Sequence, residues 1–292
     1  MLVLQFLVNG LTAGALYALM AVGFALIYNG TRVLHLAHGA VFTFAGYAMY
    51  VFGIALELPV VIAFVIAVAL TAILGALCEV LVYRPLRRQG SGAAADLVAS
   101  LGLLTLFEAV FALVFTTDTK NLHQGSLSTY EIGEVIVTNL HIVIAAVAIV
   151  LFPLLQLFLS RTRYGRAIRA LADNPRLALV LGVDTEHLYI LIFALGSALA
   201  GVAACLISYD LGVRPQMGFS IMFVALVALI IGGIGYLPGA AAGGMLLGLL
   251  QQVALWYLSA RWQEVVVFGV LVTFLVLRPQ GMFGGRLITR RA

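Results

Sequence analysis

The chain has 292 residues, of which 63% are hydrophobic and only 10% are charged, and its formal net charge is +4. A soluble domain is about half apolar and roughly a quarter charged, so this chain has too few charged residues to cover a soluble core. The composition therefore excludes an ordinary soluble protein and predicts a membrane protein. The positive charges stand in arginine clusters beside apolar segments, which argues against nucleic-acid binding.

Nine apolar segments predict an all-α, polytopic bundle of about eight to nine membrane spans within a single domain, residues 1–292. A span takes ~20 mostly apolar residues. The segments are 5–28, 39–56, 59–83, 93–115, 139–160, 188–208, 219–235, 239–257 and 262–277. The first is interpreted as a retained span, because no positive charge precedes it. The seventh and eighth are either two spans or a broken, partly re-entrant pair.

Basic residues are distributed unequally between the two sides that these segments define. Thirteen of the sixteen fall on one side, and the other three are Lys120, Arg214 and Arg261. The thirteen are Arg32, Arg84, Arg87, Arg88, Arg161, Arg163, Arg166, Arg169, Arg176, Arg278, Arg286, Arg290 and Arg291. Because basic loops remain in the cytoplasm, the pattern predicts an outside N-terminus and a cytoplasmic C-terminus.

Several glycines stand four residues apart inside the apolar segments. This spacing lets two helix backbones approach closely in lipid, so it predicts tight helix–helix packing. The pairs are Gly10 and Gly14, Gly239 and Gly243, and Gly244 and Gly248.

The sequence offers little support for an enzyme. Its single lysine, Lys120, follows a threonine, whereas a P-loop requires lysine after glycine, so this chain is not itself a P-loop ATPase. The five histidines are too dispersed to predict a metal site, and Cys78 and Cys205 lie inside apolar runs, which is typical of buried thiols. No bound cofactor or metal is expected.

Four polar residues inside the apolar segments are candidates for a substrate path. His38, Thr43 and Tyr47 open the second segment, where polar side chains could line a cavity or form ordinary bonds between helices. Glu108 is the notable ionisable group within a span. A carboxylate there costs roughly 2.5–3.5 kcal/mol, so it should face a wet path or a hydrogen-bonding neighbour near the outer interface.

The interval 161–187 is predicted to be cytoplasmic and to contain a short helix. Asp173 or Asn174 can cap the helix, Pro175 suits its first position, and Gly182 can end it.

This short helix has an apolar face although it lies outside the predicted spans. Leu177 and Leu181 stand four apart, with Ala178 beside them. Such a face either docks into a partner protein or lies on the lipid headgroups. The residues alone leave both possibilities open.

Several motifs in this and other segments resemble the permeases of branched-chain amino acid importers of the ABC class, in particular the LivH type. The motifs are Leu16-Tyr17-Ala18-Leu19, Leu26-Ile27-Tyr28, Leu36-Ala37-His38-Gly39, Gly165-Arg166-Ala167-Ile168-Arg169-Ala170, Leu181-Gly182-Val183-Asp184, Phe193 to Gly201, Gly232 to Ala240, and Arg278-Pro279-Gln280-Gly281. They extend over essentially the whole chain in the family's order.

The resemblance implies a permease in a bacterial or archaeal cytoplasmic membrane. It implies a second permease of the LivM type, two ATPase subunits that use ATP, and an extracytoplasmic binding protein as partners. It also implies that the interval 161–187 is a coupling loop that docks into an ATPase. The coupling residues would be Asn174, Pro175, Leu177, Ala178, Leu181 and Gly182.

One departure from the family concerns the substrate. The family commonly has an acidic residue after His-Gly, where this chain has Ala40. A permease for urea or short amides is therefore an alternative. A passive channel for a small neutral solute is a second one, which the scarcity of charge and the glycine-rich segments favour and the capped cytoplasmic helix opposes. A proton-coupled carrier is less favoured, because Glu108 has no evident titratable partner in the sequence.

Overall fold

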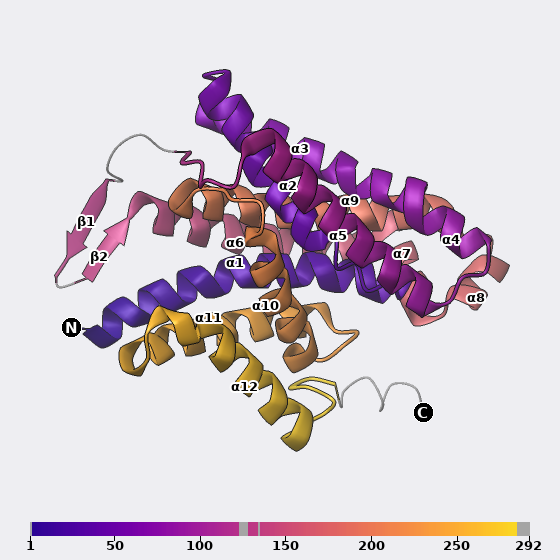
Figure 1. Ribbon diagram of the computed structural model, residues 1–292. Helices are drawn as coiled ribbons and strands as arrows, with labels where there is room; N and C mark the ends of the chain where they lie inside the picture. The colour runs from indigo at the N-terminus through magenta and orange to yellow at the C-terminus, as the bar shows by residue number, and fades with distance from the viewer. Residues whose placement is uncertain (1, 123–127, 134, 285–292) are drawn as a thin grey trace.

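Nine apolar helices pack side by side in the computed structural model, which describes residues 2–122, 128–133 and 135–284 (Figure 1). They are α1 (Leu2–Thr31), α2 (His38–Tyr50), α3 (Val60–Cys78), α5 (Ala93–Phe115), α6 (Asn139–Arg161), α9 (Thr185–Leu211), α10 (Met217–Gly232), α11 (Leu237–Tyr257) and α12 (Gln263–Leu277). Each corresponds to one predicted segment. The prediction of a polytopic helix bundle is confirmed.

The helices differ in length. In the described part of the chain, seven are long and apolar enough to cross a membrane, whereas α10 and α12 have only 16 and 15 residues. Two helices are extended by π-helical turns: η1 (Val51–Ala55) continues α2, and η2 (Glu79–Tyr83) joins α3 to α4 (Arg84–Arg88). The helices α10 and α11 are separate and antiparallel, and they meet at a turn over residues 233–236.

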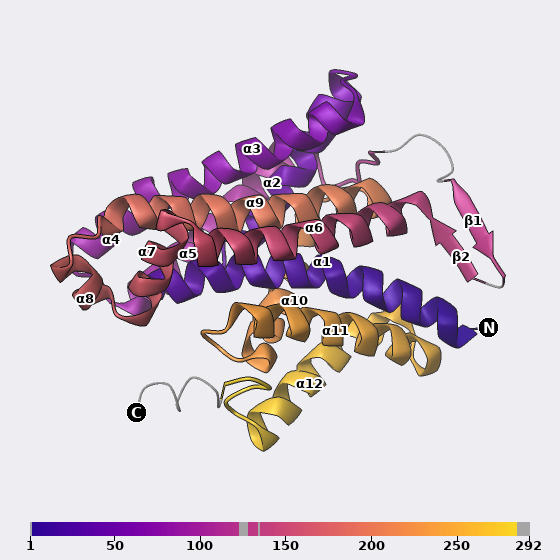
Figure 2. The same cartoon turned by 180° about the vertical axis from the view of Figure 1, so that it is seen from behind.

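The two sets of basic residues lie at opposite ends of the bundle. The ends of α1, α6 and α12, the whole of α4 and the short helices between α6 and α9 together bring ten described arginines to one end (Figures 1 and 2). Lys120, Arg214 and Arg261 lie at the other end, with the N-terminus. Arg286, Arg290 and Arg291 lie outside the described residues.

A β-hairpin at the N-terminal end of the bundle was not predicted. Strand β1 (Thr129–Ile132) pairs antiparallel with β2 (Val135–Thr138), which leads directly into α6. The side chain of Gln5 on α1 holds this hairpin: its Nε2 donates to the Ile136 carbonyl at 3.1 Å, and its Oε1 accepts from the Ile136 N–H at 2.8 Å. Gln5 therefore ties the hairpin to α1.

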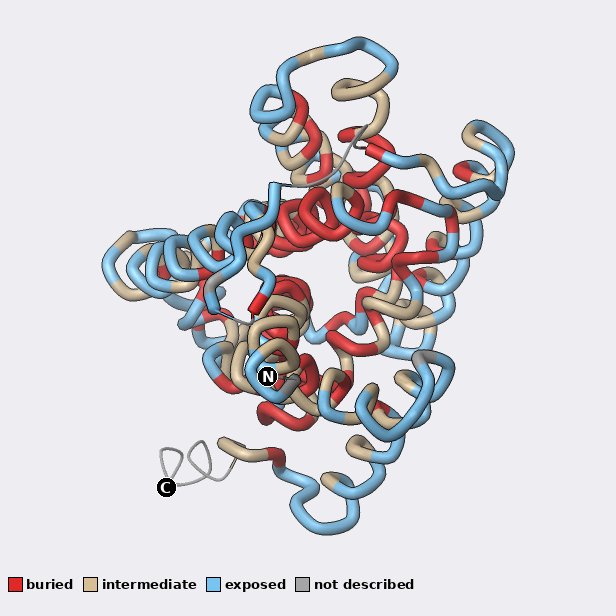
Figure 3. Tube along the Cα trace, turned by 90° about the vertical axis from the view of Figure 1, so that its left-hand side faces the viewer, coloured by how far each residue is buried: buried red, intermediate tan, exposed pale blue. Residues whose placement is uncertain are grey.

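The core of the bundle is built around α1 and α9, which are buried along most of their length. Viewed from the N-terminal end, buried backbone occupies the centre and exposed backbone the periphery (Figure 3). The peripheral helices α3, α5 and α6 expose many apolar side chains, such as Leu113 and Ile149. Exposed apolar surface of this extent suits a lipid environment.

Glycines allow α11 to approach both of its neighbours closely. A Cβ on Gly248 would overlap the backbone of Gly14 on α1, and a Cβ on Gly14 would come within 2.9 Å of the Met245 backbone. On another side of α11, a Cβ on Gly243 would overlap the carbonyl of Ala228 on α10. The predicted close helix contacts are confirmed, and they join α1, α10 and α11.

We expect Gly248→Ala to lower the free energy of unfolding by about 1–3 kcal/mol, because the added methyl group forces α1 and α11 apart. The measurement is thermal unfolding of the detergent-solubilised protein. Gly269→Ala on α12 is the matched control, because nothing lies within 4 Å of the position its Cβ would take. Unfolding of the Gly248→Ala protein at the wild-type temperature would contradict the close contact.

Candidate functional site

Two short helices lie at the arginine-rich end of the bundle, between α6 and α9. They are α7 (Arg163–Asp173) and α8 (Pro175–Val180). Only the second was predicted. The first begins where the Thr162 hydroxyl accepts a hydrogen bond from the Gly165 N–H at 2.9 Å, so α7 starts with a side-chain cap. A Cβ on Gly165 would overlap the backbone at Phe158 and Leu159, so glycine allows the sharp turn from α6 into α7.

The helix α8 has the ends that the sequence predicts. Asn174 is the N-cap, because its Oδ1 accepts from the Leu177 N–H at 3.1 Å, and Pro175 occupies the first turn. At the other end Gly182 adopts a φ of +79°, a left-handed conformation that favours glycine. The Val183 N–H then donates to the Ala178 carbonyl at 3.0 Å and closes the helix.

Most of the exposed side chains of α8 and its C-cap are apolar, and Arg176 is the charged one among them. Leu177 is 54% exposed, Val180 83% and Leu181 71%, and Leu179 is exposed beside them. We name these four side chains the α8 patch. Ala178 instead is buried and faces the bundle. The apolar residues of this helix therefore form two groups: Ala178 packs against the bundle, and the side chains of the α8 patch face outward.

The α7–α8 unit is fixed to the ends of three long helices. Ile168 and Leu171 on α7 join Ala178 in a buried apolar cluster with side chains from α1, α6 and α9, including Ile192. The Arg32 guanidinium, just past the end of α1, donates to the Ala172 carbonyl at 3.0 Å. A displacement of α8 would therefore reach α1 and α9 directly.

Ion pairs join α4 to the beginning of α9. Arg84 and Arg88 both contact the Glu186 carboxylate, and the nitrogen–oxygen distance from Arg88 is 2.8 Å.

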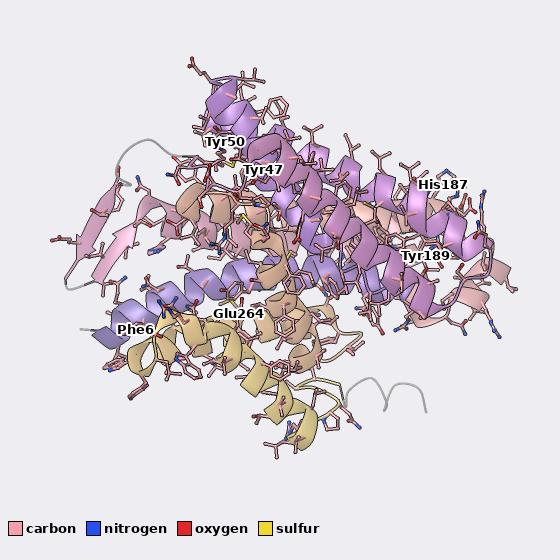
Figure 4. The ribbon with its side chains drawn as sticks, viewed as in Figure 1. Phe6, Tyr47, Tyr50, His187, Tyr189 and Glu264 are labelled. Atoms are coloured by element: carbon pink, nitrogen blue, oxygen red, sulfur yellow. The ribbon has the colours of Figure 1, made fainter. Side chains whose placement is uncertain are left out.

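Asp184 caps the start of α9, because its side chain accepts a hydrogen bond from the His187 N–H at 3.2 Å. That bond and a second from the His187 ring lower the pKa of Asp184, so the cap stays ionised near neutral pH. Figure 4 places His187 and Tyr189 at this end, near α4.

The opposite end of the bundle contains a large cavity, which we name the outer cavity. Its volume is about 1180 Å³, and α1, α6, α9, α10, α11 and α12 contribute to its walls. Charged side chains lie around its mouth, where Asp210, Arg214 and Glu264 are exposed. Glu264 accepts a hydrogen bond from the Ser220 hydroxyl at 2.9 Å and lies at the end of the bundle that holds Phe6 (Figure 4).

A polar stripe on α1 faces the outer cavity and was missed in the sequence. Gln5, Asn9 and Thr12 line it, followed one turn later by Leu16 and Tyr17. The spacing of four and three residues places these side chains on one face of a helix. A row of uncharged polar residues at helical spacing inside an apolar segment was the signal that could have identified this wall.

None of the four predicted path residues lines the outer cavity. The Thr43 hydroxyl accepts from the Gly218 N–H at 3.1 Å and donates to the Gly39 carbonyl at 3.2 Å, so it joins α2 to α10. The Tyr47 ring stacks on the Phe115 ring, and the two ring centroids are 4.2 Å apart.

The other two candidates differ in burial. His38 is fully buried beside Phe24 and His35, and its ring nitrogens have no hydrogen-bond partner among the described residues. Glu108 is half-buried on α5. A role of these four residues in transport stays a prediction. Within the described ranges, no three His, Cys, Asp or Glu side chains form a group that could hold a metal ion.

Comparison with known proteins agrees with this arrangement. The family described as branched-chain amino acid transport system, permease component, matches residues 6–275. The chain is 33% identical to the high-affinity branched-chain amino acid transport system permease protein BraD of Pseudomonas aeruginosa, covering 96% of this chain and 95% of that protein. It is 31% identical to the corresponding LivH of Escherichia coli, with the same coverage.

A solved structure also shares the fold. PsaBC from Streptococcus pneumoniae in complex with Fab matches with a TM-score of 0.55 and 13% identity, covering 99% of this chain and 96% of that one. At this identity the likeness concerns the fold alone.

The helix bundle and the family match define a multi-pass membrane permease, a class of transport subunit rather than an enzyme. The chain belongs to the family of branched-chain amino acid transport system permease components, and within it resembles the LivH type.

We expect a cysteine at position 9 to react with a small membrane-impermeant thiol reagent, because Asn9 lines the outer cavity. Ala21→Cys on the same helix is the control, since Ala21 is fully buried. The native Cys78 and Cys205 are both buried, so the background reaction is expected to be low. Labelling of the detergent-solubilised protein is measured as a shift in its mass. Equal reaction at positions 9 and 21 would contradict an open cavity at this end.

Proposed function

We propose that this chain is one permease subunit of an ABC importer for branched-chain amino acids in a bacterial or archaeal cytoplasmic membrane. The observation that carries the proposal is the exposed α8 patch at one end of a bundle whose other end holds the outer cavity. The names of the relatives support the substrate class. The whole chain forms a single transmembrane domain, and residues 161–187 form its coupling loop.

The orientation follows from the arginines. The end with α4, α7 and α8 faces the cytoplasm, and the end with the hairpin and the outer cavity faces outside. The nine apolar helices then all cross the bilayer, so the N-terminus is outside and the C-terminus inside. The shorter α10 and α12 cross because each is continued by a turn, at residues 233–236 and after Leu277.

The α8 patch is the docking surface for a separate ATPase subunit. Asn174, Pro175 and Gly182 set the ends of the helix, Ala178 anchors it, and Leu177 and Leu181 enter the partner's groove. ATP is used by two such ATPases. Their closure moves α7 and α8 as a rigid unit, and the Arg32 contact passes this movement to α1.

The outer cavity receives the substrate from an extracytoplasmic binding protein, and a second permease of the LivM type completes the membrane part. Below the cavity, residues 18–27 of α1 are almost entirely buried, which supports a path closed toward the cytoplasm in this conformation. Movement of α1 opens this path toward the cytoplasm. Ala40, where the sequence departs from the family, is buried in the core and does not line the cavity, so this departure gives no reason to reject a branched-chain substrate.

We expect Leu181→Asp to abolish co-purification of the ATPase and transport, because a carboxylate cannot enter an apolar groove without a large desolvation cost. Leu181 is 71% exposed, so the fold itself should be unaffected. Leu34→Asp is the matched control, since Leu34 is exposed at the same end but outside the α8 patch. Normal recovery of the ATPase with the Leu181→Asp permease would disprove the coupling role.

Uptake of labelled leucine in cells with and without this chain tests the substrate. We expect uptake to require the chain, to be blocked by excess valine but not by urea, and to persist with an uncoupler while ATP remains. Inhibition by urea would favour the amide permease instead. Uptake that continues without ATP would favour a passive channel.

A further inference from the structure

Gln251 differs from every other polar side chain that lines the outer cavity, because it alone is buried, with 4% of its surface exposed. It lies on α11, between α1 and α10. Its amide makes no hydrogen bond to another group in the described part of the chain. A buried amide without a protein partner is costly, so this group is available to a molecule in the cavity.

The polar side chains across the cavity on α1 already have partners. Gln5 donates to Asn9 at 3.0 Å and pairs with the Ile136 backbone, and the Thr12 hydroxyl donates to the Val8 carbonyl at 2.8 Å. These bonds use part of their hydrogen-bonding capacity within the protein. Gln251, by contrast, makes no side-chain hydrogen bond within the described residues, so both its donor and its acceptor are open to a ligand.

The outer cavity into which Gln251 opens also has an aliphatic wall. Aliphatic side chains from α1, α9 and α10 form the wall of the cavity, and the charged residues Asp210, Arg214 and Glu264 are exposed at its mouth. The aliphatic residues are Leu16, Leu206, Ile207, Ile221 and Val224. A ligand in the cavity meets the buried Gln251 amide, the neutral polar side chains of α1 and an extended aliphatic surface.

We infer that Gln251 is the specificity-determining residue of the substrate path and binds the polar end of a zwitterionic amino acid. Its carbonyl oxygen accepts from the ammonium group, its N–H donates to the carboxylate, and the aliphatic wall contacts the substrate side chain. This inference rests on the proposed function. A neutral amide suits a zwitterion because it contacts both charges without repelling either, and it avoids the cost of a charged group inside the membrane.

The test uses the whole transporter, reconstituted in proteoliposomes with its ATPases and binding protein. We expect Gln251→Leu to lower leucine transported per ATP hydrolysed at least tenfold, while ATP hydrolysis stays within twofold of wild type. Gln216→Leu is the control, because Gln216 lies at the same end of the bundle, is exposed and does not line the outer cavity, so its effect should stay below twofold. Gln251→Asn keeps an amide group, so it should support more leucine transport than Gln251→Leu. Wild-type transport by Gln251→Leu would overturn the inference.

A second variant keeps the inference testable if Gln251→Leu does not assemble. We expect Gln251→Glu to reduce leucine transport and to make arginine at least fivefold more effective as a competitor for entry, because a carboxylate attracts a cationic substrate. Unchanged leucine preference in this variant would overturn the assignment. Absence of leucine transport by the wild-type complex would instead contradict the proposed function itself, so the two failures are distinguishable.

Discussion

The close approach of α1 and α11 is the contact on which the other features depend. Apolar side chains gain little by leaving lipid for the interior of a bundle, so membrane helices associate mainly through close backbone packing. Gly14 and Gly248 provide that packing, and Gly243 extends it to α10. Because these three helices are held together along their middle, the space between their outer ends stays open as the outer cavity. The same contact thus fixes the core beside the outer cavity, to whose walls all three helices contribute.

Helix α1 also connects the outer cavity to the end of the bundle that carries α7 and α8. Its first turns carry the polar stripe of the cavity, its middle is buried against α9, α10 and α11, and its last turn is followed by Arg32, which contacts α7. A stiff helix of 30 residues transmits a displacement over its whole length, about 45 Å at 1.5 Å per residue. The bonding of Gln5 to the hairpin extends this connection beyond the membrane-embedded part.

Much of this fold could be predicted because membrane helices leave a strong apolar signal, and all nine segments became helices. The ends of α8 were predictable for a local reason, since Asn174, Pro175 and Gly182 act on the backbone beside them. The functional interior was harder. The polar stripe on α1 is visible only when Gln5, Asn9 and Thr12 are considered together. The burial of Gln251 depends on the packing of α11 against helices that include α1, which is more than 200 residues away in the sequence. His38 and Thr43 drew attention as polar residues, yet the fold places both against neighbouring helices rather than in the cavity.

The bond between Gln5 and Ile136 also affects how the hairpin behaves outside the membrane. A two-stranded hairpin has two open edges, and an open edge can pair with a strand of another chain. Gln5 occupies both the N–H and the carbonyl of Ile136, and the His141 ring contacts the Thr138 N–H at 3.4 Å, so the outer edge of β2 is largely closed. The edge of β1 carries the charge of Glu131. The hairpin is thereby protected on both sides from forming a sheet with neighbouring copies in a crowded membrane.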